Sequence, residues 1–88
     1  MTAPRSRDIF RHEFAAAFGH VLRKARERRH LSQERLAELC DRHRTFVSLL
    51  ERGQQTPSLP TLFRLAQALD IRPSVLVRRV ELELERPS

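Results

Sequence analysis

The sequence predicts one all-α domain built from five helices, and three observations support this fold class. The chain has only 88 residues, which is too short for two separate hydrophobic cores. It contains two Gly and five Pro, too few for the many turns of a multistranded sheet. Apolar residues recur every three or four positions over most of the chain, and this is the period of an amphipathic helix.

The first predicted helix begins at Ile9 and ends near Arg28 or Arg29. Asp8 is the expected N-cap, and residues 1–8 are expected to form a flexible basic tail. The apolar residues of this helix recur at the helical period: Phe10, Phe14, Phe18, Val21, Leu22 and Ala25. The row of three phenylalanines either extends the core or forms a surface for a partner, and the sequence alone leaves both interpretations open.

Two short helices follow, separated by a polar turn. Ser32 is the expected N-cap of a helix over residues 33–40. The next helix is expected over residues 44–52, and Gly53 ends it because glycine tolerates a positive φ angle. Helices of two turns are marginal in isolation, so we expect both to be held by packing of their inward side. The residues expected on that side are Leu36, Ala37, Cys40, Val47 and Leu50.

The last two helices carry their own start signals. Ser58 is the expected cap of the fourth helix, in which Pro60 lies in the first turn, and Pro73 begins the fifth. Residues 80–85 also alternate between apolar and acidic, which is the period of a strand. Helix and strand therefore both remain open there, although Glu and Leu favour the helix. Residues 77–88 are expected to be a helical extension that serves dimerisation or a partner.

Composition excludes several functional classes. The single Cys40 permits no internal disulfide, and the absence of a CxxC or HExxH motif predicts no metal site. No glycine-rich loop is present, so we expect no cofactor and no small-molecule ligand. No nucleophile is paired with a base, so no enzyme activity is expected. The longest apolar run, residues 14–18, is too short for a membrane span, and a soluble cytoplasmic protein is expected.

The charge of the chain points to a polyanionic partner. The net charge is +6, from 17 basic and 11 acidic residues. Residues 1–31 carry +5 and residues 54–79 carry +3, whereas the segment between them is neutral. Two basic flanks around a neutral centre suit a protein that grips DNA at its edges and reads it with its middle. A small basic protein without any nucleic-acid role is the alternative.

The outward side of the third predicted helix carries the residue types that read DNA. Arg44 can form two parallel hydrogen bonds to guanine, and Thr45 and Ser48 can donate or accept at several bases. Leu49 can contact a thymine methyl group. The alternative is an ordinary polar surface, and residue types alone do not decide between the two.

Several motifs, taken together, resemble the helix-turn-helix family of phage Cro and repressor proteins, also called the XRE family. The motifs are Gly19-His-Val-Leu-Arg-Lys-Ala-Arg26, Leu31-Ser-Gln-Glu-Arg-Leu-Ala-Glu38, Phe46-Val-Ser-Leu-Leu-Glu-Arg-Gly53, Pro57-Ser-Leu-Pro-Thr-Leu62 and Leu65-Ala-Gln-Ala-Leu69. The resemblance covers residues 18–76, about two thirds of the chain. It implies a five-helix, lambda-repressor-like DNA-binding domain, here over residues 9–76 with an extended first helix. The third helix is then expected to enter the major groove.

The resemblance also implies a role for individual residues. The positions that match base-contacting residues are Arg44, Thr45, Ser48 and Leu49, and those that match phosphate-contacting residues are Gln33, Arg52, Gln54, Gln55 and Thr56. Arg26 and Glu51 match an ion pair that ties the first helix to the third. Three residues depart from the family pattern. Asp41 and Asp70 replace glycines, at modest cost because Asp tolerates the left-handed region, and His43 replaces the usual Ser or Thr cap, which weakens that cap.

The function expected from these features is sequence-specific transcriptional regulation by a protein that binds double-stranded DNA. One short helix contacts few base pairs, so we expect a homodimer on a palindromic operator. The dimer or partner surface is expected at Leu76, Val80 and Leu84, or at the phenylalanine row. A phage-type repressor, a restriction–modification controller and an antitoxin all fit, and the antitoxin would also bind a toxin. Polymerase is a further expected partner.

Overall fold

The computed structural model describes residues 7–87, and these residues form five α-helices without a strand. The helices are α1 (Arg7–Arg28), α2 (Gln33–Leu39), α3 (Arg44–Glu51), α4 (Leu59–Ala68) and α5 (Pro73–Glu85). The predicted all-α fold with five helices is therefore confirmed. Residues 80–85 are helical, which settles the choice that the alternating pattern left open.

Helix α1 begins earlier than the sequence predicts. It starts at Arg7, so Asp8 lies inside the helix and is not its N-cap. Most of the predicted basic tail, residues 1–6, lies outside the described residues. The phenylalanine row divides along the helix, because Phe18 is fully buried and Phe14 is partly buried, whereas Phe10 is 53% exposed. The row therefore extends the core at its C-terminal end and reaches the surface at its N-terminal end.

Local signals define most of the other helix ends. The Ser32 hydroxyl accepts a hydrogen bond from the backbone N–H of Arg35 at 2.9 Å, and this satisfies one of the free N–H groups at the start of α2. The Ser58 hydroxyl accepts one from the backbone N–H of Thr61 at 3.3 Å at the start of α4. Gly53 ends α3 with a φ of 72°, as expected.

The two aspartates that replace family glycines adopt the conformation that the resemblance requires. Asp41 has a φ of 60° and Asp70 has a φ of 57°. Both values lie in the left-handed region, which costs Asp less than most residues. The turn between α2 and α3 and the turn after α4 therefore keep their geometry.

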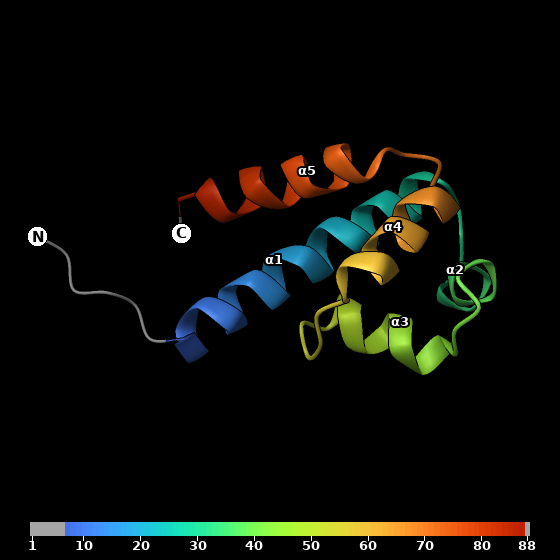
Figure 1. The fold of residues 1–88 in the computed structure, drawn as a ribbon, viewed down its shortest axis with the longest axis horizontal. Helices are drawn as coiled ribbons and strands as arrows, with labels where there is room; N and C mark the ends of the chain where they lie inside the picture. Colours follow the sequence, from blue (N-terminus) through green and yellow to red (C-terminus); the bar gives the residue numbers. More distant parts are fainter. Residues whose placement is uncertain (1–6, 88) are drawn as a thin grey trace, which may run out of the picture.

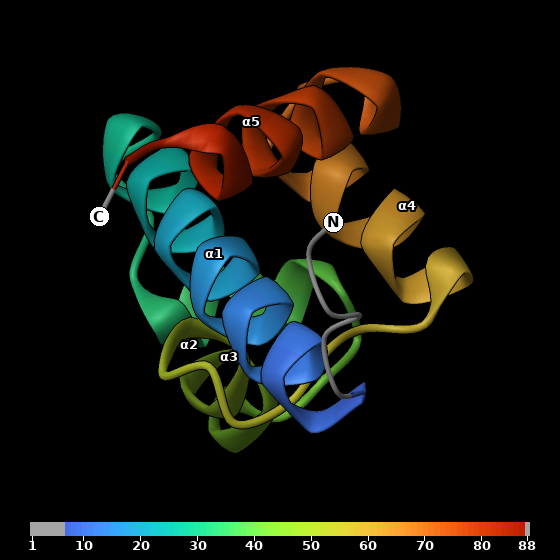
Figure 2. The ribbon, with the colours of Figure 1, turned by 90° about the vertical axis from the view of Figure 1, so that its left-hand side faces the viewer.

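Helix α1 is the centre of the arrangement. It packs against α5 on one side and against α3 on the other, while α2 packs on α3 and α4 packs on α5 (Figure 1). Figure 2 shows α5 at one edge of the molecule and α2 and α3 at the opposite edge, with α1 between them. All five helices contribute to one core, whose largest fully buried side chains are Phe18, Leu22, Leu36, Val47, Leu50, Leu65, Leu69 and Leu76.

The core corrects one prediction about the C-terminal helix. Leu76 is 0% exposed and Val80 is 4% exposed, because this face of α5 packs against the other helices of the same chain. Neither residue can form the dimer or partner surface that the sequence suggested. Of the three residues in that set, Leu84 alone reaches the surface, with 37% of its area exposed.

Candidate nucleic-acid interface

Helix α3 begins with an imidazole in place of the usual hydroxyl cap. Nδ1 of His43 accepts a hydrogen bond from the backbone N–H of Thr45 at 3.1 Å, and the Thr45 hydroxyl lies 3.0 Å from the same nitrogen. His43 thus supplies the side-chain acceptor that Ser or Thr supplies in the family pattern, and the weaker cap expected from the sequence stays a prediction.

The two sides of α3 differ in what they contact. Val47 and Leu50 are fully buried in the core. The four predicted base-contacting residues lie at positions i, i+1, i+4 and i+5, which share one side of a helix. Arg44 and Thr45 are exposed, and Ser48 and Leu49 are half-buried. The structure therefore brings this set together on the outward side of α3, where it is available to a partner.

The predicted phosphate-contacting residues flank that side. Arg52 is the C-cap of α3 and is exposed, as are all three residues of the loop 54–56 that follows. Gln33, at the start of α2, is half-buried, and its Nε2 donates a hydrogen bond to Oε1 of Glu51 at 3.0 Å. An amide nitrogen carries two hydrogens, so this bond leaves one N–H of Gln33 for a phosphate.

The ion pair expected between Arg26 and Glu51 is present and largely buried. Nε of Arg26 donates to Oε2 of Glu51 at 2.6 Å, and Nη2 donates to Oε1 at 3.0 Å. The two side chains are 12% and 3% exposed. The hydrogen bonds to Glu51 raise the pKa of Arg26, and burial opposes this to a smaller extent. A third bond, from Nη1 of Arg26 to the Leu31 carbonyl at 2.7 Å, holds the chain between α1 and α2.

Two structural contacts that support this surface were not predicted from the sequence. A Cβ atom on Gly19 would lie 2.4 Å from the carbonyl oxygen of Leu50, so α1 and the end of α3 approach too closely for any other residue. The available signal was a glycine in the middle of a helix. The Arg42 guanidinium lies 4.7 Å from the centre of the Phe46 ring and donates to the Thr61 hydroxyl at 3.1 Å, which ties α3 to α4.

The chain contains one cysteine, Cys40. Cys40 is buried, and burial raises the pKa of its thiol against a smaller opposing effect of Arg42 and Arg64. Within residues 7–87 no three His, Cys, Asp or Glu side chains lie close enough to hold a metal ion. In the same part of the chain, no helix has the length and apolar character needed to cross a bilayer.

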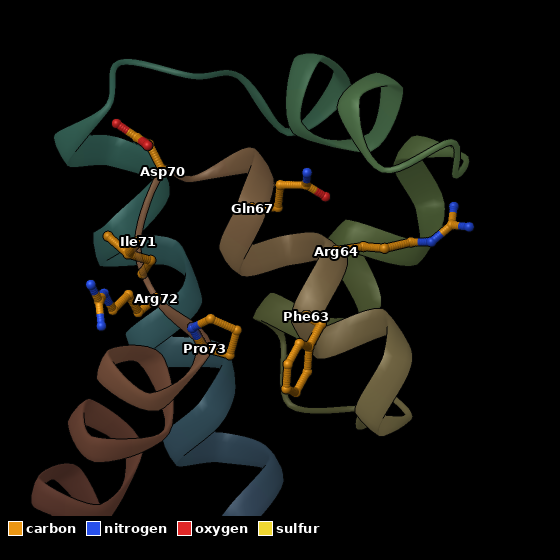
Figure 3. Close-up of a pocket in the computed structure, with 7 residues that line it drawn as sticks. All are labelled: Phe63, Arg64, Gln67, Asp70, Ile71, Arg72 and Pro73. Carbon is orange, nitrogen blue, oxygen red and sulfur yellow. The ribbon is translucent and has the colours of Figure 1, made fainter.

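The hollow between α4 and the start of α5 is an open surface feature of about 640 Å³. Figure 3 shows Phe63 and Pro73 facing the space between the two helices, whereas Arg64 points away from it. Phe63 is 53% exposed. The polar side chains around the hollow do not converge on one point, so its chemistry is that of an apolar surface with a charged rim.

Comparisons with known proteins agree with this arrangement. Residues 22–76 match the family model HTH_3, described as helix-turn-helix. The chain is 39% identical over 61 residues to the control protein C.BamHI of Bacillus amyloliquefaciens, which covers 68% of this chain and 75% of that protein. The crystal structure of the restriction-modification controller protein C.AhdI from Aeromonas hydrophila is similar, with 45% identity and a TM-score of 0.68 over 70% of this chain and 90% of that one.

A further solved structure shows the same fold together with DNA. The restriction-modification controller protein C.Esp1396I, a tetramer in complex with its natural 35 base-pair operator, has a TM-score of 0.75 to this chain at 22% identity. The similarity covers 83% of this chain and 96% of that one.

Proposed function

The chain belongs to the HTH_3 family of helix-turn-helix, DNA-binding transcription regulators, and from that premise we propose that it is a restriction–modification controller that binds its operator as a homodimer. The observation that carries the proposal is the outward side of α3, whose side chains are not buried in the core. These residues are Arg44, Thr45, Ser48 and Leu49. The control proteins C.BamHI and C.AhdI support the choice of a controller over the other roles.

The mechanism is binding rather than chemistry. Helix α3 enters the major groove, where Arg44 offers paired donors to a guanine and the neighbouring residues contact adjacent bases. Gln33, Arg52 and the loop 54–56 contact phosphates on either side and set the register of α3 on the duplex. No observation on the described residues favours the antitoxin alternative.

The homodimer follows from the size of the interface. An α3 of eight residues reads few base pairs, so two copies must bind half-sites about 34 Å apart on one side of the duplex. We place the contact on α4, where Leu59 and Phe63 are 66% and 53% exposed and lie one turn apart. Figure 2 shows α4 on the other side of α1 from α2 and α3, so a contact on α4 leaves the outward side of α3 uncovered.

The test is selection of bound duplexes from a random pool. We expect a palindromic consensus, and we expect the same sequence upstream of the gene for this chain, next to a restriction enzyme gene. Arg44→Ala should lose the preference for the selected duplex over random DNA with an unchanged circular-dichroism spectrum. Arg78→Ala, which removes an exposed arginine from α5, is the matched control.

Three outcomes would contradict the proposal in different ways. A pool without enriched sequences would refute sequence-specific binding. Full discrimination by Arg44→Ala would remove Arg44 from the reading surface. A consensus that is absent from the neighbourhood of its own gene would refute the controller role while leaving DNA recognition in place.

A further inference from the structure

The first helical turns of α1 lie beside the loop that follows α3. These turns come before residues 22–76, the segment that matches the family model. Figure 1 shows the loop between α3 and the N-terminal part of α1, along the same lower edge of the molecule, and Figure 2 shows the same order. The two segments line a hollow of about 710 Å³. Its lining includes Arg11, His12 and Phe14 from α1 and Gly53, Gln54 and Thr56 from the loop.

A close backbone contact fixes the loop after α3 against α1. Gly53 has a φ of 72°, and a Cβ atom there would lie 3.2 Å from Cα of Ala16. The loop therefore rests directly on α1 with no side chain between them. Arg11 is five residues before Ala16, which places it about 7.5 Å further along the helix axis. The position of Arg11 relative to the loop 54–56 is thus set by the fold and does not depend on a flexible tail.

The charge around Arg11 suits an anion. Arg11 is exposed, and its guanidinium makes no hydrogen bond or ion pair with the described residues. Glu13, two residues later, lines a different hollow with His20 and Glu83. Arg11 is therefore an exposed cation that lines the same hollow as a loop that is proposed to contact phosphate.

We propose that Arg11 extends the DNA interface by contacting the phosphate backbone beyond the loop 54–56. Phosphates of one strand are spaced about 3.4 Å along the duplex axis, which is close enough for Arg11 and the loop 54–56 to contact different phosphates of the same strand. The guanidinium offers the paired N–H donors that phosphate oxygens accept. This inference rests on the proposed DNA binding and assigns a contact to a residue outside the segment 22–76 that matches the family.

The experiment measures the affinity of full-length variants at several salt concentrations. The probes are the duplex selected from the random pool and a random duplex of equal length. For Arg11→Ala, we expect the slope of log affinity against log salt to fall in magnitude by about 0.9, the value for one phosphate contact on B-DNA. The affinity for both duplexes should fall together, so the ratio between them stays the same. Arg11→Lys should restore most of the slope.

Arg78→Ala controls for the loss of one positive charge. Arg78 lies on α5, at the edge opposite α3 in Figure 2, so its removal should leave the slope unchanged. An Arg11→Ala slope equal to that of Arg78→Ala and wild type would overturn the inference while DNA binding stands. A loss confined to the selected duplex would assign Arg11 to base reading, which also overturns it. A wild-type protein that binds neither duplex would instead refute the proposed function itself.

Discussion

Removing the carboxylate of Glu51 should destabilise the protein more than any exposed charge change. Glu51→Ala deletes both hydrogen bonds to Arg26 and the one from Gln33. Arg26 keeps its charge, because an arginine does not lose its proton in the folded protein, and its side chain is only 12% exposed. A buried charge without its partner costs about 3–5 kcal/mol. A domain of this size is stable by roughly 5–15 kcal/mol, so the variant approaches unfolding.

The assay is urea unfolding followed by circular dichroism at 222 nm, with the slope of the transition checked against wild type. The matched control is Glu81→Ala, whose partner Arg78 lies 2.7 Å away with both side chains 59% exposed. Water screens that pair, so the control should be nearly as stable as wild type. If Glu51→Ala fails to fold, the double variant Arg26→Met/Glu51→Leu supplies the measurement, because replacing both partners removes the unpaired charge.

The reasoning would be refuted by a Glu51→Ala midpoint as close to wild type as that of Glu81→Ala. It would also be refuted by a double variant that is less stable than Glu51→Ala alone. Either result would mean that water or a rearranged side chain compensates Arg26, and that the pair does not hold α3 against α1.

Two further predictions concern packing and assembly. Gly19→Ala gains about 1 kcal/mol of helix propensity but places Cβ 2.4 Å from the Leu50 carbonyl oxygen, and overpacking costs about 1–3 kcal/mol. We expect a net loss in the unfolding free energy, and a higher melting temperature would contradict it. Phe63→Glu should convert the proposed dimer to a monomer by light scattering while Leu84→Glu does not, and the reverse result would move the contact to α5.

The helix ends were predictable because their signals are local. Ser32, Ser58 and Gly53 act on backbone groups within three or four residues, so the sequence around each one contains the whole interaction. The N-terminal end was misplaced for a related reason. Asp8 is a good capping residue, but nothing in the sequence showed that the helix would continue past it to Arg7.

The packing of α5 could not be predicted from periodicity. The pattern of Leu76 and Val80 identifies an apolar face, but the same pattern results whether that face covers its own core or a second protein. Only the positions of α1 and α4 decide, and these depend on contacts between segments far apart in the chain. The Arg26–Glu51 pair spans 25 residues, and it was expected from the family resemblance and not from any local spacing.

The same carboxylate connects stability with DNA recognition. Oε1 of Glu51 accepts from Arg26 on α1 and from Gln33 at the start of α2, at 3.0 Å in each case. Glu51 is itself the last residue of α3. The amide that is proposed to hold a phosphate is therefore oriented by the helix that is proposed to read bases. Because Glu51 holds both Gln33 and α3, the distance between the proposed phosphate contact of Gln33 and the base-reading side of α3 is already set in the free protein. Ordering these groups on DNA binding therefore costs little free energy.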